Sequence, residues 1–202
     1  MVEILAHRAL FNGREHSIDG IKHYVNLGIG VEIDIRSNKN GVYISHDKQG
    51  VGELFENVCK VSKNLKTTMA LHIKEIEAVK KAVNLLEKYS IKNYFLFDTD
   101  QNDLSKIIKS QKIGKYINKK PIKSKQKILW CDEVHDKWYD KELILELHKN
   151  NNFIYAVSLE IFKKCSKKEM ITEWKRLIEL GIDGICTDFP EELMKFSRGD
   201  LN

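Results

Sequence analysis

The residues best suited to chemistry lie in one stretch, residues 30–47. Glu32 and Asp34 alternate there with isoleucine and valine, and this period of two predicts a strand with both carboxylates on one face. Their backbone positions are then roughly 6–7 Å apart. Two such acids suit a hard divalent cation. His46 and Asp47 follow a predicted turn and a second short strand, and a histidine delivered there suits proton transfer. On this stretch alone, a solvated strand face with a turn is the alternative.

Further polar residues occur in a definite order along the whole chain. They are His7-Arg8, Glu15, Glu32-x-Asp34, His46-Asp47 and a closing segment, 181–190, that reads GIDGICTDFP. This ordered set resembles the glycerophosphodiester phosphodiesterase family, whose signature is HRG, ENT, ExD and HD, followed near the C-terminus by GxDGxxTDxP. Each short motif is weak by itself. The order of the set carries the resemblance, which spans nearly the whole chain.

The resemblance implies a metal-dependent hydrolase that cleaves a glycerophosphodiester-like small molecule into an alcohol and a phosphomonoester. The cofactor would be a divalent ion, Mg²⁺, Ca²⁺ or Mn²⁺. The implied roles are metal binding by Glu32 and Asp34, acid and base catalysis by His7 and His46, and phosphate binding by Arg8 and Lys74. Glu15 and Asp47 are expected to orient their neighbours, and Asp98 and Asp132 are expected to support the site from the ends of later strands.

Three departures from the family pattern bear on function. Ala9 stands where the family has the HRG glycine, and His72 stands where it has a third metal-binding glutamate. A histidine ligand moves preference from Mg²⁺ or Ca²⁺ toward Mn²⁺ or Zn²⁺. Only residues 48–66 separate HD from the next strand, so the family's usual insertion is missing. These departures keep two alternatives open: a degenerate barrel that binds an anionic phosphorylated ligand, and a lyase-type enzyme that releases a cyclic phosphate.

Other polar residues are interpreted as structural. We expect Asp188 to cap the helix that begins at Pro190. The remaining histidines lie in helical or loop contexts, and we interpret them as surface or capping residues: His16, His23, His135 and His148.

Apolar patterning predicts strands that alternate with helices. The expected strands are 1–8, 31–36, 67–74, 93–98, 116–117, 127–131, 153–158 and 184–187, with a short hairpin strand at 42–45; the expected helices are 17–26, 54–64, 75–88, 103–112, 141–149, 166–180 and one from 190. Parallel βα units follow, and eight strands fit a compact (β/α)₈ TIM barrel. An open doubly wound sheet is the runner-up, but the first βα turn has no GxGxxG. A barrel would gather all the strand ends at one face.

Composition bounds the remaining possibilities. The 202 residues suit a single domain covering 1–202, and 42% hydrophobic residues with 31% charged are typical of a globular protein. Four scattered cysteines predict free thiols. The sequence has no apolar run of roughly 18 residues and no leader pattern, so we expect a cytoplasmic protein with no membrane span. The net charge of +5 comes without a basic stripe, which argues against nucleic-acid binding and leaves the oligomeric state open.

Overall fold

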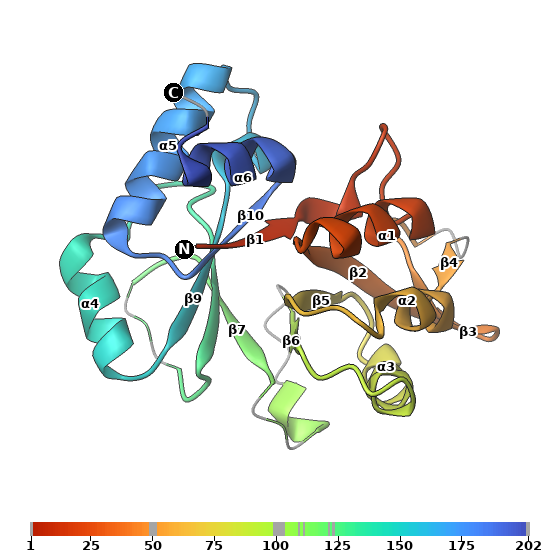
Figure 1. Ribbon diagram of the computed structural model, residues 1–202. Helices are drawn as coiled ribbons and strands as arrows, with labels where there is room; N and C mark the ends of the chain where they lie inside the picture. Colours follow the sequence, from red (N-terminus) through yellow and green to blue (C-terminus); the bar gives the residue numbers. More distant parts are fainter. Residues whose placement is uncertain are drawn as a thin grey trace.

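The computed structural model describes residues 2–48, 52–98, 104–108, 110, 112–120, 122 and 124–200. Eight parallel strands form a curled sheet in the order β6-β5-β2-β1-β10-β9-β8-β7 (Figure 1). Two antiparallel strands, β3 and β4, extend it from the far part of β2. The strands are β1 Glu3–Ala6, β2 Gly30–Asn38, β3 Gly41–Ile44, β4 Glu53–Leu54, β5 Met69–Ile73, β6 Tyr94–Phe97, β7 Gly114–Ile117, β8 Ile128–Cys131, β9 Phe153–Val157 and β10 Gly184–Thr187.

The curled sheet is TIM-like, but its strand ladder does not close within the described residues. The edge strands β6 and β7 meet at one isolated bridge, between Leu96 and Ile113. There the Leu96 N–H donates to the Lys112 carbonyl at 2.8 Å. The α/β class is therefore confirmed, whereas a fully closed (β/α)₈ barrel is not. The reason lies in the sequence around β7, which is basic and has little apolar alternation, so it sustains only a short strand.

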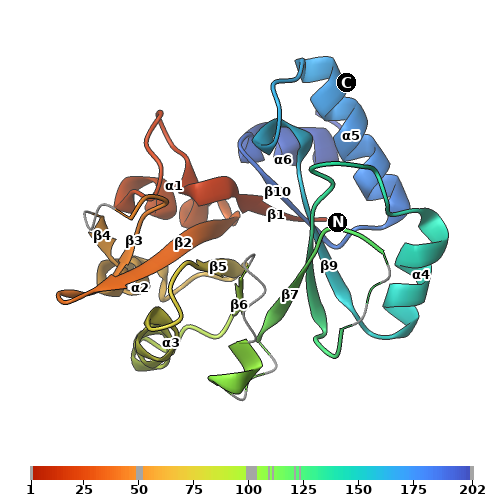
Figure 2. The same cartoon turned by 180° about the vertical axis from the view of Figure 1, so that it is seen from behind.

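Helices lie outside the sheet, with α1, α2 and α3 on one side and α4, α5 and α6 on the other (Figures 1 and 2). Ser17 caps α1 and Ser166 caps α5, where Ser166 forms a capping box with Glu169. The helix expected over 103–112 is wrong: a 3₁₀ turn covers Leu104–Lys106, and Asp103 lies outside the described residues. The helices are α1 Ile18–Leu27, α2 Phe55–Ser62, α3 Ala78–Lys88, α4 Lys141–Lys149, α5 Lys167–Leu180 and α6 Pro190–Arg198.

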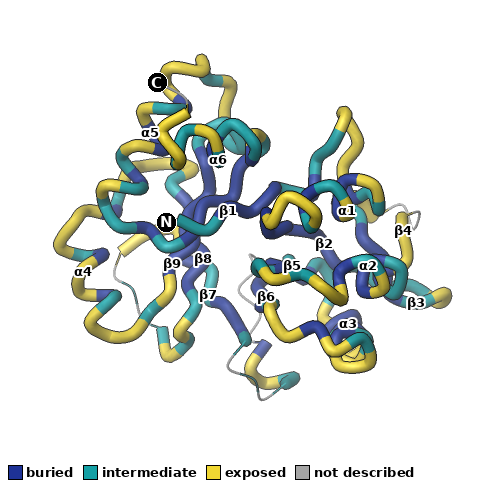
Figure 3. The backbone as a smooth tube through the Cα atoms, in the orientation of Figure 1, coloured by how far each residue is buried: buried dark blue, intermediate teal, exposed yellow. Residues whose placement is uncertain are grey.

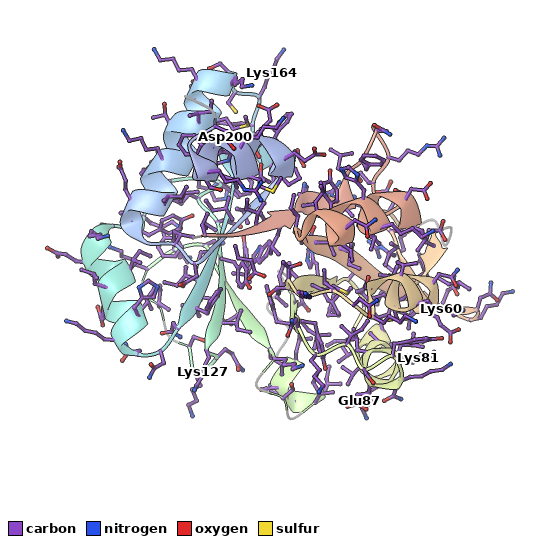
Figure 4. All side chains as sticks on the ribbon, viewed as in Figure 1. Lys60, Lys81, Glu87, Lys127, Lys164 and Asp200 are labelled. Atoms are coloured by element: carbon purple, nitrogen blue, oxygen red, sulfur yellow. The ribbon has the colours of Figure 1, made fainter. Side chains whose placement is uncertain are left out.

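Two apolar clusters hold the fold. The larger one packs the helices against the outer face of the sheet, and the smaller one, which includes Phe95, Trp130 and Tyr155, fills the space that the strands enclose. Figure 3 shows the consequence: β1, β2, β5, β9 and β10 are largely buried, and the helices expose their outer faces. Charged side chains labelled in Figure 4 point away from the sheet. No helix in the described ranges is long and apolar enough to cross a bilayer.

The Tyr155 side chain fills the N-terminal end of the space that the strands enclose. Its hydroxyl donates to Glu3 at 2.7 Å, and its ring lies against Gly184 on the next strand. A Cβ at Gly184 would come within 2.4 Å of that ring, so only glycine fits there. This end is closed by packing, which leaves the carboxyl ends of the strands as the face where chemistry can occur.

Candidate active site

The carboxyl ends of the parallel strands surround one opening, which we call the mouth of the curled sheet. The two carboxylates of β2 and the histidine of β5 meet there. Parallel pairing sets Asp34 opposite His72 and Glu32 opposite Ala70, so the period of two sends all three polar side chains inward. Glu32 is 3% exposed and Asp34 is 2% exposed. One ligand atom from each of Glu32, Asp34 and His72 lies within 4.8 Å of the other two. The sequence-based grouping of these three residues agrees with their placement.

Asp34 is the most constrained carboxylate of the site. Its Oδ1 lies 2.9 Å from His72 Nδ1 and 3.1 Å from Lys74 Nζ. Burial acts to raise the pKa of Asp34, but the His72 imidazole and the Lys74 ammonium, both beside Oδ1, hold that pKa well below its ordinary value. Asp34 is therefore ionised at any physiological pH.

His16 was expected at the surface or at a cap, and that expectation is wrong. It is 7% exposed, and its Nε2 accepts a hydrogen bond from the Asp34 backbone N–H at 3.1 Å. The same nitrogen lies 3.1 Å from Asp34 Oδ2. A nitrogen that accepts has no proton to donate, which agrees with Oδ2 being buried without a hydrogen-bond partner among the described residues. The sequence did contain a signal for a role of His16 in the site, because His16 stands at the position of the asparagine in the ENT motif that begins at Glu15.

These residues fit a divalent cation. An orphaned, buried carboxylate oxygen is costly unless something positive occupies the space before it. Asp34 Oδ2 is such an atom, and Glu32 and His72 offer further donors within reach. Arg8 Nε lies 3.7 Å from Oδ2 and supplies part of the positive charge. The donor set combines carboxylate oxygens with one imidazole nitrogen, a mixture that suits Mn²⁺ or Zn²⁺ better than Ca²⁺.

Arg8 is held at the mouth by a strained turn after β1. Its backbone φ is +51°, and its N–H donates to Glu32 Oε2 at 3.0 Å. Its guanidinium Nη1 donates to both carboxylate oxygens of Glu15, each at 3.1 Å. The His16 N–H donates back to the Arg8 carbonyl at 2.7 Å. Non-glycine residues seldom adopt a positive φ, so this turn is fixed by its surroundings.

His7 is oriented by an aspartate from the far end of the chain. Its Nδ1 lies 2.7 Å from Asp188 Oδ1. The interpretation of Asp188 as a helix cap is wrong, because the N-cap of α6 is Phe189 and Asp188 pairs with His7 instead. Burial acts to lower the pKa of His7, but the Asp188 hydrogen bond and the charge of Glu32 outweigh it, and the pKa is raised above 6.5.

His46 lies beside the acidic cluster on the hairpin that follows β3. Its side chain is 43% exposed, and its Nδ1 is 3.0 Å from Asp47 Oδ1, which supports an orienting role for Asp47. It shares a surface depression with Glu15 and His16 rather than the cavity that holds His7. His16 connects the two places, because it contacts Asp34 and also lines the depression.

Arg36 fixes the backbone that carries His46, and sequence reasoning assigned it no role. Its Nη2 donates to the His46 carbonyl at 2.7 Å, and its Nη1 contacts Glu75 at 2.6 Å. Glu75 also accepts from the Ser37 N–H at 2.9 Å. Arg36 could have been found from the alternation within β2, because the same period of two that places Glu32 and Asp34 on the inner face also includes Arg36.

The two later aspartates occupy different positions. Asp132 follows β8 and lines the same cavity as His7 and Lys74. Burial raises the pKa of Asp132, opposed by hydrogen bonds from Tyr116 and the Val134 N–H. Asp98 is buried directly after β6, next to Phe97. Both lie at strand ends, as the sequence predicted, and their supporting role stays a prediction.

Comparison with known proteins bears on the fold. No protein-family model and no curated protein matches the sequence. The TIM-like fold does match solved structures. Two are glycerophosphodiester phosphodiesterases from Parabacteroides distasonis: one has 16% identity, a TM-score of 0.74 and coverage of 98% of both chains. The other has 14% identity, a TM-score of 0.65 and coverage of 100% of this chain and 87% of that one.

A third match is more distant. It is a Ca²⁺-dependent phosphatidylinositol-specific phospholipase C from Streptomyces antibioticus, with 7% identity, a TM-score of 0.59 and coverage of 95% of both chains. The resemblance found in the sequence motifs is thus confirmed at the level of the fold, which is that of glycerophosphodiester phosphodiesterases.

Proposed function

We propose that this protein is a metal-dependent phosphodiesterase, with one domain covering residues 1–202. It hydrolyses a glycerophosphodiester-like small molecule to an alcohol and a phosphomonoester. The observation that carries the proposal is convergence: His7 with its Asp188 partner, Arg8, Lys74 and the Glu32–Asp34–His72 cluster line one cavity at the mouth of a phosphodiesterase-like fold. Such a concentration of opposite charges in one concave place is typical of active sites.

Each group has a role in the proposed mechanism. Arg8 and Lys74 hold the anionic phosphate, and their charges stabilise the transition state. A divalent ion held by Glu32, Asp34 and His72 would add Lewis-acid stabilisation of phosphoryl oxygens. The raised pKa of His7 keeps more of its imidazole protonated near neutral pH, which suits donation of a proton to the leaving alkoxide. His46, paired with Asp47, is the base that takes a proton from the attacking hydroxyl. That hydroxyl belongs either to water, which gives the phosphomonoester directly, or to the substrate itself, which gives a cyclic phosphate that water then opens.

The test is phosphodiester consumption by the purified protein. Glycerophosphocholine is incubated with Mg²⁺, Ca²⁺ or Mn²⁺ and followed by phosphorus NMR, which also separates a phosphomonoester product from a cyclic phosphate. His7→Ala should lower kcat/KM by about 10²–10⁴, the usual contribution of acid–base catalysis. His148→Ala is the matched control, since His148 pairs with Asp183 away from the mouth. Activity that survives loss of both His7 and His46 would refute the mechanism.

A further inference from the structure

The cavity that holds the proposed catalytic residues has a second, apolar wall. Phe97 on β6, Trp130 on β8 and Val157 on β9 line it together with Ile161 and Phe162, which follow β9. Phe97 stacks on His72 with ring centroids 4.8 Å apart, and on Trp130 at 4.3 Å. The cavity volume is about 140 Å³. A phosphate bound by Arg8 and Lys74 would therefore face hydrocarbon on its other side.

The loop after β9 turns its polar groups away from this wall. Glu160 accepts hydrogen bonds from the hydroxyls of Ser158 and Thr187 and from the Asp188 N–H. The Ser158 hydroxyl oxygen also accepts from the buried Trp174 indole at 2.7 Å. With its polar groups bonded to one another, the loop presents Ile161 and Phe162 to the cavity.

The apolar surface continues beyond the phosphate site. Val157 and Phe162 also line a neighbouring cavity of about 110 Å³, together with Val134 and Leu159. Two acids on its border are already neutralised: Glu173 pairs with Lys137 at 2.6 Å, and Glu133 pairs with Arg176. His135 and Lys163 also border this second cavity, so a hydrocarbon chain that enters it from the first cavity packs on its apolar side, against Val157, Leu159 and Phe162.

We propose that the substrate carries an acyl or alkyl chain on one side of its phosphodiester and that Phe162 and Ile161 recognise this chain. The inference rests on the proposed function and names its substrate class. The hydroxyls of a bare glycerol need hydrogen-bond partners, but this wall of the cavity consists of rings and aliphatic side chains. A hydrocarbon chain gains from leaving water in the same place, and each buried methylene adds to the affinity.

The experiment compares two substrates that differ only in the chain. Glycerophosphocholine and its monohexanoyl ester are each incubated with the protein and Mn²⁺, and substrate loss is followed by phosphorus NMR. The ester should have a kcat/KM at least about tenfold higher, mainly through KM. Phe162→Ala should reduce that ratio severalfold. Phe153→Ala, at the opposite end of β9 and exposed, is the matched control and should leave the ratio unchanged.

The outcomes separate the two proposals. If glycerophosphocholine is consumed as fast as its ester, or if Phe162→Ala leaves the ratio unchanged, the chain-binding inference is wrong and the phosphodiesterase proposal stands. If neither substrate is consumed with any of the divalent ions, the phosphodiesterase proposal is wrong. Calorimetry with the same pair then decides the inference. Binding of the ester alone, weakened by Phe162→Ala and retained in Phe153→Ala, supports it, and absence of ester binding overturns it.

Discussion

The mouth of the sheet has two halves. Both are built from the ends of parallel strands, but one half carries charged side chains and the other apolar side chains. The ends of β1, β2 and β5 carry charges, among them Arg8, Asp34 and Lys74. The ends of β6, β8 and β9 carry Phe97, Trp130 and Val157, with Asp98 and Asp132 as the acids that directly follow β6 and β8. Both halves consist of parallel strands that end at the same face, so the backbone does not explain the contrast. Residue identity at the last inward position of each strand decides whether that strand contributes chemistry or packing.

The two halves depend on each other. Rings beside the acidic cluster exclude water and lower the local dielectric, which strengthens the attraction between Asp34 and its cationic neighbours. The stacking of Phe97 on His72 is the direct contact between the halves. We therefore expect substitutions in the apolar half to change mainly the free energy of unfolding, and substitutions in the polar half to change mainly activity and metal binding.

The largest effect on stability should come from Phe97→Ala. Phe97 is fully buried and stacks on both His72 and Trp130, so its removal leaves a cavity. Such truncations typically lower the free energy of unfolding by about 3–5 kcal/mol. Urea denaturation followed by tryptophan fluorescence measures the change. A loss below about 1 kcal/mol would show that the aromatic wall does not hold the mouth together, and the comparison of the two halves would fail.

Sequence reasoning found the polar half because its signals are local. Alternation within β2 placed Glu32 and Asp34 on one face, and the same alternation within β5 placed His72 and Lys74 there. It missed the partner of His7, because Asp188 lies 181 positions away and its neighbour Pro190 suggested a cap. The open junction between β6 and β7 was missed because counting eight strands ignores their lengths, and the basic, weakly alternating sequence around β7 sustains only a short strand.

The next effect concerns the pH dependence set by Asp188. Asp188→Asn removes a charge that stabilises protonated His7, so the raised pKa of His7 should fall. Hydrogen bonds to charged groups contribute about 1.5–3 kcal/mol. The limb of the kcat/KM profile due to His7 should therefore move toward lower pH.

The control for this variant is another aspartate that pairs with a histidine. Asp183→Asn breaks the contact with His148, which lies away from the mouth, and should leave the profile in place. If Asp188→Asn lowers the rate at every pH without moving the limb, Asp188 does not tune His7, and its role is limited to holding the loop.

A somewhat smaller effect should follow from His72→Glu. This substitution replaces the nitrogen donor in the cluster with a carboxylate and restores an all-oxygen set with Glu32 and Asp34. Affinity for Mg²⁺ or Ca²⁺ should rise, because hard cations prefer oxygen ligands. Calorimetric titration of each ion measures the change without relying on turnover. Unchanged affinity and ion preference would show that position 72 does not face the ion.

The smallest effect should come from Ala9→Gly, in the turn that follows β1. Ala9 has a φ of +46° and is fully buried. Left-handed backbone costs an alanine about 1–2 kcal/mol, which glycine would relieve. Against this, glycine makes the unfolded chain more flexible by about 0.4–1 kcal/mol, and the buried methyl group contributes about 0.8 kcal/mol. These contributions nearly cancel, so the free energy of unfolding should change by less than about 1 kcal/mol.

Gly20→Ala provides the contrast, since its Cβ would lie 2.3 Å from the Ala9 carbonyl oxygen and should destabilise the same turn clearly. If Ala9→Gly proved as damaging as Gly20→Ala in thermal denaturation, packing of the Ala9 methyl group, and not its backbone conformation, would control this turn.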